Sequence, residues 1–250
     1  MSRPLTVSQV RKRYGDTPVI GGLDIEVAPS EIVAIVGPSG CGKSTLLRLI
    51  AGLDTRFSGE IRVDDELVCG PDPRVGMVFQ EPRLFPWLTL AQNVGFGLAE
   101  RHGPKARDIV RETLEVVGLA DFADALPKQL SGGMAQRAAL ARGLVTEPQV
   151  LLLDEPFSAL DAFTRMRLQD HLLAAWTRYQ PTLVLVTHDL DEAVYLADRV
   201  ILLTDRPARV ADVLRVAPGR PRDRRDPSLL GLRVALLEAL HLERSQLVGV

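Results

Sequence analysis

The sequence predicts an α/β domain with a mostly parallel sheet and an inserted helical lobe. Apolar runs of strand length alternate with segments whose apolar residues recur at helical spacing. This alternation is typical of parallel strands joined by crossover helices. The four clearest runs are Ile32–Val36, Val150–Leu153, Thr182–Val186 and Val200–Leu203. At 250 residues, the chain is long enough for one large domain or for a core with a smaller inserted lobe.

The composition argues against several classes of protein. The 30 basic and 32 acidic residues give a formal net charge of −2, which lacks the basic excess of nucleic-acid-binding domains. The two cysteines, Cys41 and Cys69, are too few for a disulfide framework and fit a reducing cytosol. No apolar run approaches the roughly 18 residues of a membrane span, and no signal-peptide core follows Met1. We therefore expect a soluble protein that reaches a membrane only through another chain.

The first predicted strand leads into a glycine-rich loop and then a helix. Strand Ile32–Val36 is followed by Gly37, Pro38, Ser39, Gly40, Cys41, Gly42, Lys43 and Ser44. Backbone N–H groups of such a loop at a helix N-terminus bind phosphate oxygens, and its glycines permit close approach. Lys43 would then reach the β- and γ-phosphates, and the Ser44 hydroxyl would ligate Mg²⁺. We interpret Cys41 as a space-filling residue and not as a redox switch.

Residues 86–147 are predicted to form the inserted helical lobe, because they contain almost no strand-like runs. A helical stripe within them ends at Gly118 and comprises Ile109, Val110, Thr113, Leu114 and Val117. A second stripe belongs to a helix that Pro148 stops, and comprises Met134, Ala138, Ala141 and Val145.

The α/β core is predicted to comprise residues 1–85 and 148–215, and a linker and terminal helix follow at 216–250. The helix that begins at Lys43 should run to about Ala51 and end at Gly52. Later core helices should follow strand Val150–Leu153 and lie near Asp191–Ala197. The terminal helix should start at Asp226-Pro227, where proline suits the first turn. Its apolar stripe comprises Leu229, Leu232, Leu236 and Leu240. All of these parts are predicted to form one domain.

Three polar residues follow buried strands at positions suited to catalysis. Asp154 and Glu155 end strand Val150–Leu153, and His188 follows strand Thr182–Val186. These positions should lie at the carboxyl edge of the sheet, where α/β folds bind ligands. Asp154 suits holding Mg²⁺ through water, and Glu155 suits activating an attacking water as general base. An isolated His188 is more often structural than catalytic.

Ser131, Gly132 and Gly133 predict a second anion-binding site. Ser131 can cap the helix that follows, and the free N–H groups of its first turn attract negative charge. A chain with two anion sites can bind one nucleotide between two copies of itself.

Taken together, these motifs resemble those of the ATPase subunits of ABC (ATP-binding cassette) transporters, over about Leu5 to Arg215. Tyr14 resembles the aromatic residue that stacks on adenine, and Gln80 the glutamine that joins core to helical lobe. Leu130–Met134 resembles the family signature, Ser158–Asp161 the dimer-contact loop, and His188 the γ-phosphate switch residue.

The resemblance implies a P-loop NTPase core with an antiparallel N-terminal β portion, and ATP and Mg²⁺ as ligands. Glu155, His188, Lys43 and Gln80 would be catalytic, and Ser44, Gln80 and Asp154 would bind the metal. The nucleotide would contact Tyr14, residues 37–44, Thr45, Gln80, Ser131, Gly132 and Gly133. The implied assembly is a head-to-tail homodimer bound to transmembrane permease subunits at the cytoplasmic face of a bacterial inner membrane. A periplasmic solute-binding protein would take part indirectly, and nucleic acid would not be a partner.

Two positions depart from the family pattern. Met134 replaces the glutamine most common after the signature glycines, which could weaken contact with the partner's nucleotide. Ser30 replaces the usual glycine in the turn before the loop strand, so it must tolerate the backbone of that turn.

Three stretches, Gln80–Thr89, Leu130–Met134 and Phe157–Arg165, resemble the nitrate/sulfonate/taurine importers, and within them the aliphatic-sulfonate ATPases most. Phe85, Pro86 and Trp87 would line the groove for the membrane subunit, or would simply pack on the helical lobe. Taurine, nitrate, bicarbonate and a thiamine precursor remain alternative solutes. A non-transport ABC ATPase, an exporter ATPase and a P-loop kinase are the alternative functions. They fit less well, because the chain lacks a long heptad insertion and membrane spans, and a kinase would not explain the signature.

Overall fold

The computed structural model describes residues 2–98 and 103–248, without the side chains beyond residue 240. The chain divides into two compact units. The first, called the loop unit here, comprises Arg3–Asp72 and Thr182–Val250 and contains the phosphate loop. The second, called the signature unit, contains Pro73–Pro181. Among the described residues, no helix combines the length and apolar composition needed to cross a bilayer.

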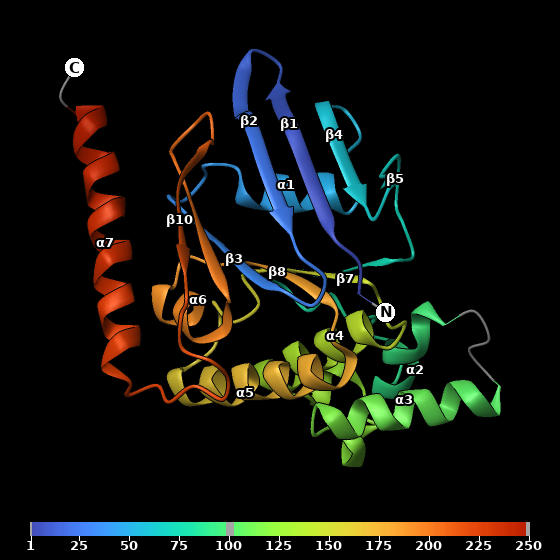
Figure 1. Ribbon diagram of the computed structural model, residues 1–250. Helices are drawn as coiled ribbons and strands as arrows, with labels where there is room; N and C mark the ends of the chain where they lie inside the picture. The colour runs from blue at the N-terminus through green and yellow to red at the C-terminus, as the bar shows by residue number, and fades with distance from the viewer. Residues whose placement is uncertain (1, 99–102, 249–250) are drawn as a thin grey trace. The chain divides into compact units, whose positions relative to one another are not determined.

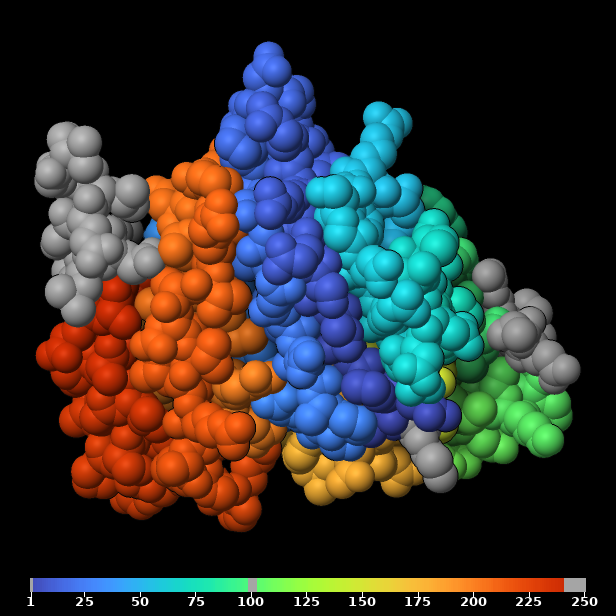
Figure 2. All heavy atoms as spheres, turned by 45° about the horizontal axis from the view of Figure 1, so that its top comes forward, coloured from blue at the N-terminus to red at the C-terminus, as the bar shows by residue number. Residues whose placement is uncertain are grey.

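An antiparallel sheet forms the N-terminal part of the loop unit, in the order β2-β1-β4-β5. Its strands are β1 (Leu5–Tyr14), β2 (Thr17–Val27), β4 (Ser58–Val63) and β5 (Glu66–Leu67). Burial nearly alternates along β2 from Leu23, because side chains of a strand point to opposite faces. Figure 2 shows these blue and cyan strands side by side on one face. The expected antiparallel N-terminal portion is confirmed.

The second set of strands in the loop unit carries the phosphate loop. The order is β10-β9-β3-β8, with β3 (Ile32–Val36), β8 (Thr182–Val186) and β9 (Arg199–Leu203) parallel to one another. Strand β10 (Val210–Arg215) is antiparallel to β9. Strands β3 and β8 are buried at every residue, which explains why all their residues are apolar except Thr182, whose hydroxyl donates to Arg3 O. Helices α1 (Lys43–Ile50) and α6 (Leu190–Leu196) follow β3 and β8 (Figure 1), as the sequence predicted.

The turn before β3 shows how Ser30 replaces glycine. Ser30 adopts a left-handed backbone conformation with φ 58°, which is costly for residues other than glycine. The Ala28 N–H donates to the Glu31 carboxylate at 2.8 Å, and the Ser30 N–H donates to Thr182 Oγ1 at 3.3 Å. These bonds stabilise the turn, and the expected constraint at Ser30 is confirmed.

The signature unit pairs β6 (Val75–Val78) in parallel with β7 (Val150–Asp154). Between Leu90 and Leu144 its described residues form helices and turns without a strand. These helices are α2 (Leu90–Val94), η1 (Gly95–Gly97), α3 (Pro104–Val116), η2 (Ala120–Phe122), η3 (Pro127–Gln129) and α4 (Gly132–Leu144). Gly118, at φ 66°, follows the end of α3 as predicted. Helix α5 (Ala162–Tyr179) comes after β7 and buries Leu168, Leu172 and Ala175.

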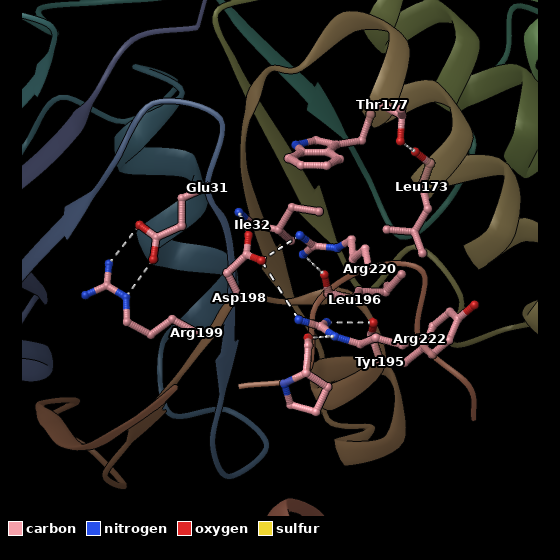
Figure 3. Close-up of polar contacts among 12 residues, drawn as sticks. Glu31, Ile32, Leu173, Thr177, Tyr195, Leu196, Asp198, Arg199, Arg220 and Arg222 are labelled. Atoms are coloured by element: carbon pink, nitrogen blue, oxygen red, sulfur yellow. Dashed lines mark hydrogen bonds and ion pairs between the residues drawn. The ribbon is translucent and has the colours of Figure 1, made fainter. Parts of the chain in front are cut away.

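The segment before the terminal helix is held to α6 by two arginines. Helix α7 (Pro227–Val248) begins at the predicted proline, and Leu229 and Leu236 of its stripe are buried. Arg222 donates to the carbonyls of Tyr195 at 2.8 Å and Val194 at 3.3 Å. Arg220 donates to Leu196 O and to Asp198 Oδ1 (Figure 3). The arginines thereby satisfy carbonyls at the C-terminal end of α6.

The Arg222 side chain is only 1% exposed. Burial, together with the nearby Arg220 charge, lowers the pKa of Arg222 to about 10. The group therefore remains protonated at neutral pH and needs its carbonyl partners.

Replacing Arg222 with methionine should destabilise the chain, because Val194 and Tyr195 carbonyls would lose their donor. We expect a loss of about 2–4 kcal/mol in the free energy of unfolding, measured by urea denaturation. Arg225→Met is the matched control: Arg225 lies three residues away and is 89% exposed, so its ion pair contributes little. Equal urea midpoints for the two variants would refute the role of the buried arginine.

Candidate functional site

The phosphate loop of the loop unit folds around the Lys43 side chain. Gly42 adopts φ 126° and precedes the first residue of α1, so the loop runs directly into a helix N-terminus. Lys43 is 5% exposed, and its ammonium donates to Gly37 O at 2.8 Å and Pro38 O at 2.9 Å. Ser39 and Gly40 are exposed at the tip of the loop. Ser44 and Thr45 follow Lys43 in the first turn of α1 and are partly exposed.

Cys41 is fully buried in this loop. Burial raises the pKa of its thiol, so the reactive thiolate is disfavoured. A Cβ at Gly37 would lie 3.3 Å from Cys41 Sγ and 2.9 Å from Leu203 O. Cys41 therefore fills space in a tightly packed loop, as the sequence suggested.

Arg206 contacts the phosphate loop and was missed by the sequence analysis. It lies between β9 and β10, and its Nε donates to Gly40 O. The contact places a positive charge beside the exposed tip of the loop, which suits an anionic ligand. No local pattern in the sequence signals this contact, because 166 residues separate the two positions.

Tyr14 ends β1 and is 49% exposed, as a residue that stacks on a ligand requires. Its hydroxyl donates to Asp54 Oδ2 at 3.1 Å. Lys12 lies over the Tyr14 ring, with its ammonium 4.6 Å from the ring centroid. The sequence predicts a role for Tyr14, but no motif in it indicates Lys12 or Asp54.

His188 is presented by a hydrogen-bonded corner at the end of β8. Thr187 donates its hydroxyl to Glu192 at 2.5 Å, and Asp189 Oδ1 accepts from the Asp191 and Glu192 N–H groups at 2.9 Å and 3.2 Å. Thr187 and Glu192 are buried, whereas His188 is exposed. The corner therefore holds the histidine backbone while its ring is accessible.

In the signature unit, Asp154 ends β7 with only 8% exposure, and Glu155 follows it. Glu155 has a left-handed backbone with φ 46°, a strain of about 1–3 kcal/mol that is common at functional sites. Gln80 donates to Ser158 Oγ at 3.1 Å, and Ser158 Oγ donates to Glu155 O at 3.1 Å. The structure thus joins Gln80 to the backbone of Glu155 through Ser158.

The signature residues form a helix cap. Ser131 Oγ accepts from the Met134 N–H at 3.3 Å at the start of α4. A Cβ at Gly133 would lie 2.4 Å from Thr164 Cγ2, so close packing requires glycine there. A Cβ at Gly132 would meet nothing within 4 Å. The first signature glycine therefore lies where a ligand can approach, and Met134 contributes its backbone to the cap.

Hydrogen bonds from Asn93 and Arg142 hold the loop that carries Trp87. Asn93 is fully buried and bonds Phe85, Leu88 and Thr89 through four hydrogen bonds, the shortest from Phe85 N at 2.7 Å. Arg142 donates to the carbonyls of the preceding loop residues, Pro82 and Arg83, at 2.8 Å each. Phe85 contacts Phe96 with the rings tilted by 40° and their centroids 4.5 Å apart, whereas Trp87 is 72% exposed. Phe85 thus packs on the lobe while Trp87 points outward.

The donor set suits Mg²⁺ bound together with phosphate. No cluster of three or more His, Cys, Asp or Glu side chains that could hold a metal occurs in the described part of the chain. Mg²⁺ usually takes only one or two protein carboxylates, with water and substrate phosphates completing its shell. Ser44 of the loop unit offers a hydroxyl and Asp154 of the signature unit offers a carboxylate, and each is a donor type that Mg²⁺ accepts.

Comparison with known proteins agrees with these motifs. The ABC transporter family matches residues 20–158. An aliphatic sulfonates import ATP-binding protein of Burkholderia lata is 56% identical over 92% of this chain and 83% of its own length. One of Pseudomonas aeruginosa is 55% identical over 93% of this chain and 95% of its own.

Among solved structures, a dimeric ATP-binding cassette in a post-hydrolysis state with ADP and Pi has a TM-score of 0.75 to this chain. It is 31% identical, and the match covers 86% of this chain and all of the other. The expected P-loop NTPase fold is thereby confirmed. On the match to residues 20–158 and on more than 50% identity to relatives across most of its length, the chain belongs to the ABC transporter family.

Proposed function

We propose that this chain is the ATP-hydrolysing subunit of a bacterial importer of aliphatic sulfonates. The observation that carries the proposal is identity of 52–56% to sulfonate-import ATPases over more than nine-tenths of the chain. The relatives span Burkholderia, Pseudomonas and Xanthomonas. This resemblance favours sulfonates over taurine, nitrate, bicarbonate or a thiamine precursor.

The phosphate-binding residues have distinct roles in the proposal. The backbone of residues 37–42 binds the phosphates of ATP, and Lys43 exchanges its carbonyl partners for β- and γ-phosphate oxygens. Ser44 ligates Mg²⁺ directly and Asp154 holds it through water. When bound, Mg²⁺ offsets the negative charge that develops on the phosphate oxygens.

Hydrolysis is assigned to three further residues. Glu155 accepts a proton from the attacking water as general base. Gln80 orients that water and contacts the metal, and His188 donates to the γ-phosphate. The hydrogen bonds from Gln80 to Ser158 and from Ser158 to Glu155 O support a coupled response of Gln80 and Glu155. The exposure of His188 supports its role as the switch residue.

The active form is proposed to be a head-to-tail homodimer. Each Ser131–Gly133 cap would bind the γ-phosphate held by the partner subunit's phosphate loop. The dimeric state of similar cassettes supports this arrangement. The open space at Gly132 is also what such an approach requires.

The dimer is proposed to work beneath two permease subunits at the cytoplasmic face of the inner membrane, with a periplasmic binding protein supplying the solute. Trp87 is the residue that we propose contacts the permease, because it is exposed on a loop that Asn93 and Arg142 hold rigid. A P-loop kinase fits less well, since a kinase has no use for the signature helix.

Glu155→Gln should reduce ATP hydrolysis by roughly 10²–10⁴-fold while ATP binding persists, because glutamine cannot accept the proton. The variant should also accumulate as an ATP-bound dimer on size exclusion. Glu115→Gln, on the exposed face of α3, is the matched control and should hydrolyse ATP at the wild-type rate. Near-normal turnover by Glu155→Gln would exclude it as the general base.

Mixing a Lys43→Ala chain with a Ser131→Arg chain should restore activity that neither has alone. In a mixed dimer both lesions fall in one shared site and leave the other intact. Recovery should approach about a quarter of the wild-type rate, since random assortment makes half the dimers mixed. A Lys43→Ala chain mixed with one carrying both lesions is the control, because every site then lacks Lys43. No recovery from proven mixed dimers would argue against a shared site.

A strain lacking this gene should grow on sulfate but fail when a simple alkanesulfonate is the sole sulfur source. The wild-type gene should restore growth and Glu155→Gln should not, because uptake depends on hydrolysis. Trp87→Ala should restore growth poorly, whereas the control Phe122→Ala, at an aromatic residue 44% exposed, should restore it fully.

Normal alkanesulfonate growth of the deletion strain, without a second uptake system, would contradict the sulfonate assignment. The same strain tested on taurine, nitrate and thiamine precursors would then identify the solute.

A further inference from the structure

Lys12 is a buried cation beside an exposed aromatic ring. Its side chain is 3% exposed, although Tyr14, two residues along the same strand, is 49% exposed. Removing an ammonium group from water is costly unless charged or polar partners replace the water. Lys12 Nζ has two such partners, Asp54 Oδ2 at 2.6 Å and Arg56 O at 2.7 Å. The chain therefore holds this charge at one defined position.

That position lies over one face of the Tyr14 ring, 4.6 Å from its centroid. The distance is within the range of cation–π attraction. The Tyr14 hydroxyl donates to Asp54 Oδ2, the same oxygen that pairs with Lys12. The ring is thus fixed at two points, its face by Lys12 and its hydroxyl by Asp54. The hydrogen bond from Lys12 is the main cause that lowers the pKa of Asp54, so the carboxylate stays ionised at neutral pH.

The contact joins the ring to the phosphate-binding helix. Asp54 follows α1, whose first turn carries Lys43 and Ser44. Gly52, at φ 67°, turns the chain after α1, and a Cβ there would lie 1.9 Å from Gly70 O. The Leu53 N–H donates back to Arg48 O at 2.9 Å. Asp54 is therefore placed by the end of the same helix that begins at the phosphate loop.

The surroundings leave room for a flat ligand at Tyr14. Tyr14 borders a hollow of about 610 Å³ that Arg48, Leu53 and Asp54 also line. Figure 2 shows the β1–β2 hairpin (blue) and the start of β4 (cyan) on the same face of the surface. Lys12 covers one face of the ring, and Tyr14 as a whole is still 49% exposed.

We propose that Lys12 and Asp54 are positioning residues of a nucleobase subsite, in which they hold the Tyr14 ring with its open face toward the base of the bound nucleotide. This inference rests on the proposed function, because it takes Tyr14 as the residue that stacks on the base. It goes further in assigning two residues that set the orientation of the ring and its distance from the phosphate loop.

The test compares a ligand that has a base with one that lacks it. Isothermal titration of the purified chain would use Mg²⁺ complexes of a non-hydrolysable ATP analogue and of inorganic tripolyphosphate. Stacking on an aromatic residue accounts for a large part of base affinity, so Tyr14→Ala should weaken analogue binding by about tenfold or more. Lys12→Met and Asp54→Asn should each weaken it by about three- to tenfold. Tripolyphosphate binding should stay within about twofold in all three variants.

Arg11→Met is the matched control. Arg11 lies next to Lys12 on β1, is exposed, and does not line the hollow that Tyr14 borders. Losing this charge should leave both affinities unchanged, which separates positioning from general attraction of anions. If Lys12→Met alone does not fold, the double variant Lys12→Met/Asp54→Asn removes both charges together and should show the same base-dependent loss.

The outcomes separate the inference from the proposed function. Equal weakening of both ligands in the Lys12 and Asp54 variants would mean a merely structural role and overturn the inference. Unchanged analogue affinity in these variants, with a loss in Tyr14→Ala, would also overturn it and leave the nucleotide site standing. Failure of the wild-type chain to bind either ligand would instead overturn the proposed function.

Discussion

The short connection from β3 through the phosphate loop to α1 is the constraint on which the nucleotide site depends. A strand buried at every residue ends at Val36, and a helix begins seven residues later at Lys43. The Lys43 ammonium bonds to the Gly37 and Pro38 carbonyls and so ties the helix start to the strand end. Leu203 leaves no space for a Cβ at Gly37. Because strand and helix are both packed, the loop has one shape in which its N–H groups can face an anion.

A strained backbone or a buried polar side chain lies at or next to three of the candidate functional residues. Glu155 has a left-handed backbone, and Ser158 donates to its carbonyl. His188 projects from a corner whose Thr187–Glu192 bond is buried. Trp87 is exposed on a loop that the fully buried Asn93 supports. In each case, hydrogen bonds restrict the conformations that the exposed residue can adopt. The loss of conformational entropy is incurred when the chain folds.

The ATP chemistry and the proposed solute are supported by different kinds of observation. ATP chemistry is supported by residues of this chain, because the loop, the carboxylates and the signature each have a physical role. None of the site residues described above is proposed to contact the transported solute. The sulfonate assignment therefore depends on 52–56% identity to relatives and on the loop around Trp87.

The sequence by itself determined the elements and the principal site residues. Strands β3 and β8 match the runs Ile32–Val36 and Thr182–Val186 residue for residue, because burial on both faces favours a continuous apolar run, in which Thr182 is the one polar residue. Glycine and proline likewise marked Gly118 and Pro227 as helix boundaries. Local patterns also identified Lys43, Ser131 and Glu155. Only the tertiary structure revealed Lys12, Asp54, Arg206 and Arg222, since each acts through a partner far along the chain and none belongs to a local repeat. Hydrogen bonds between distant segments depend on how the backbone folds, and no periodicity in sequence records them.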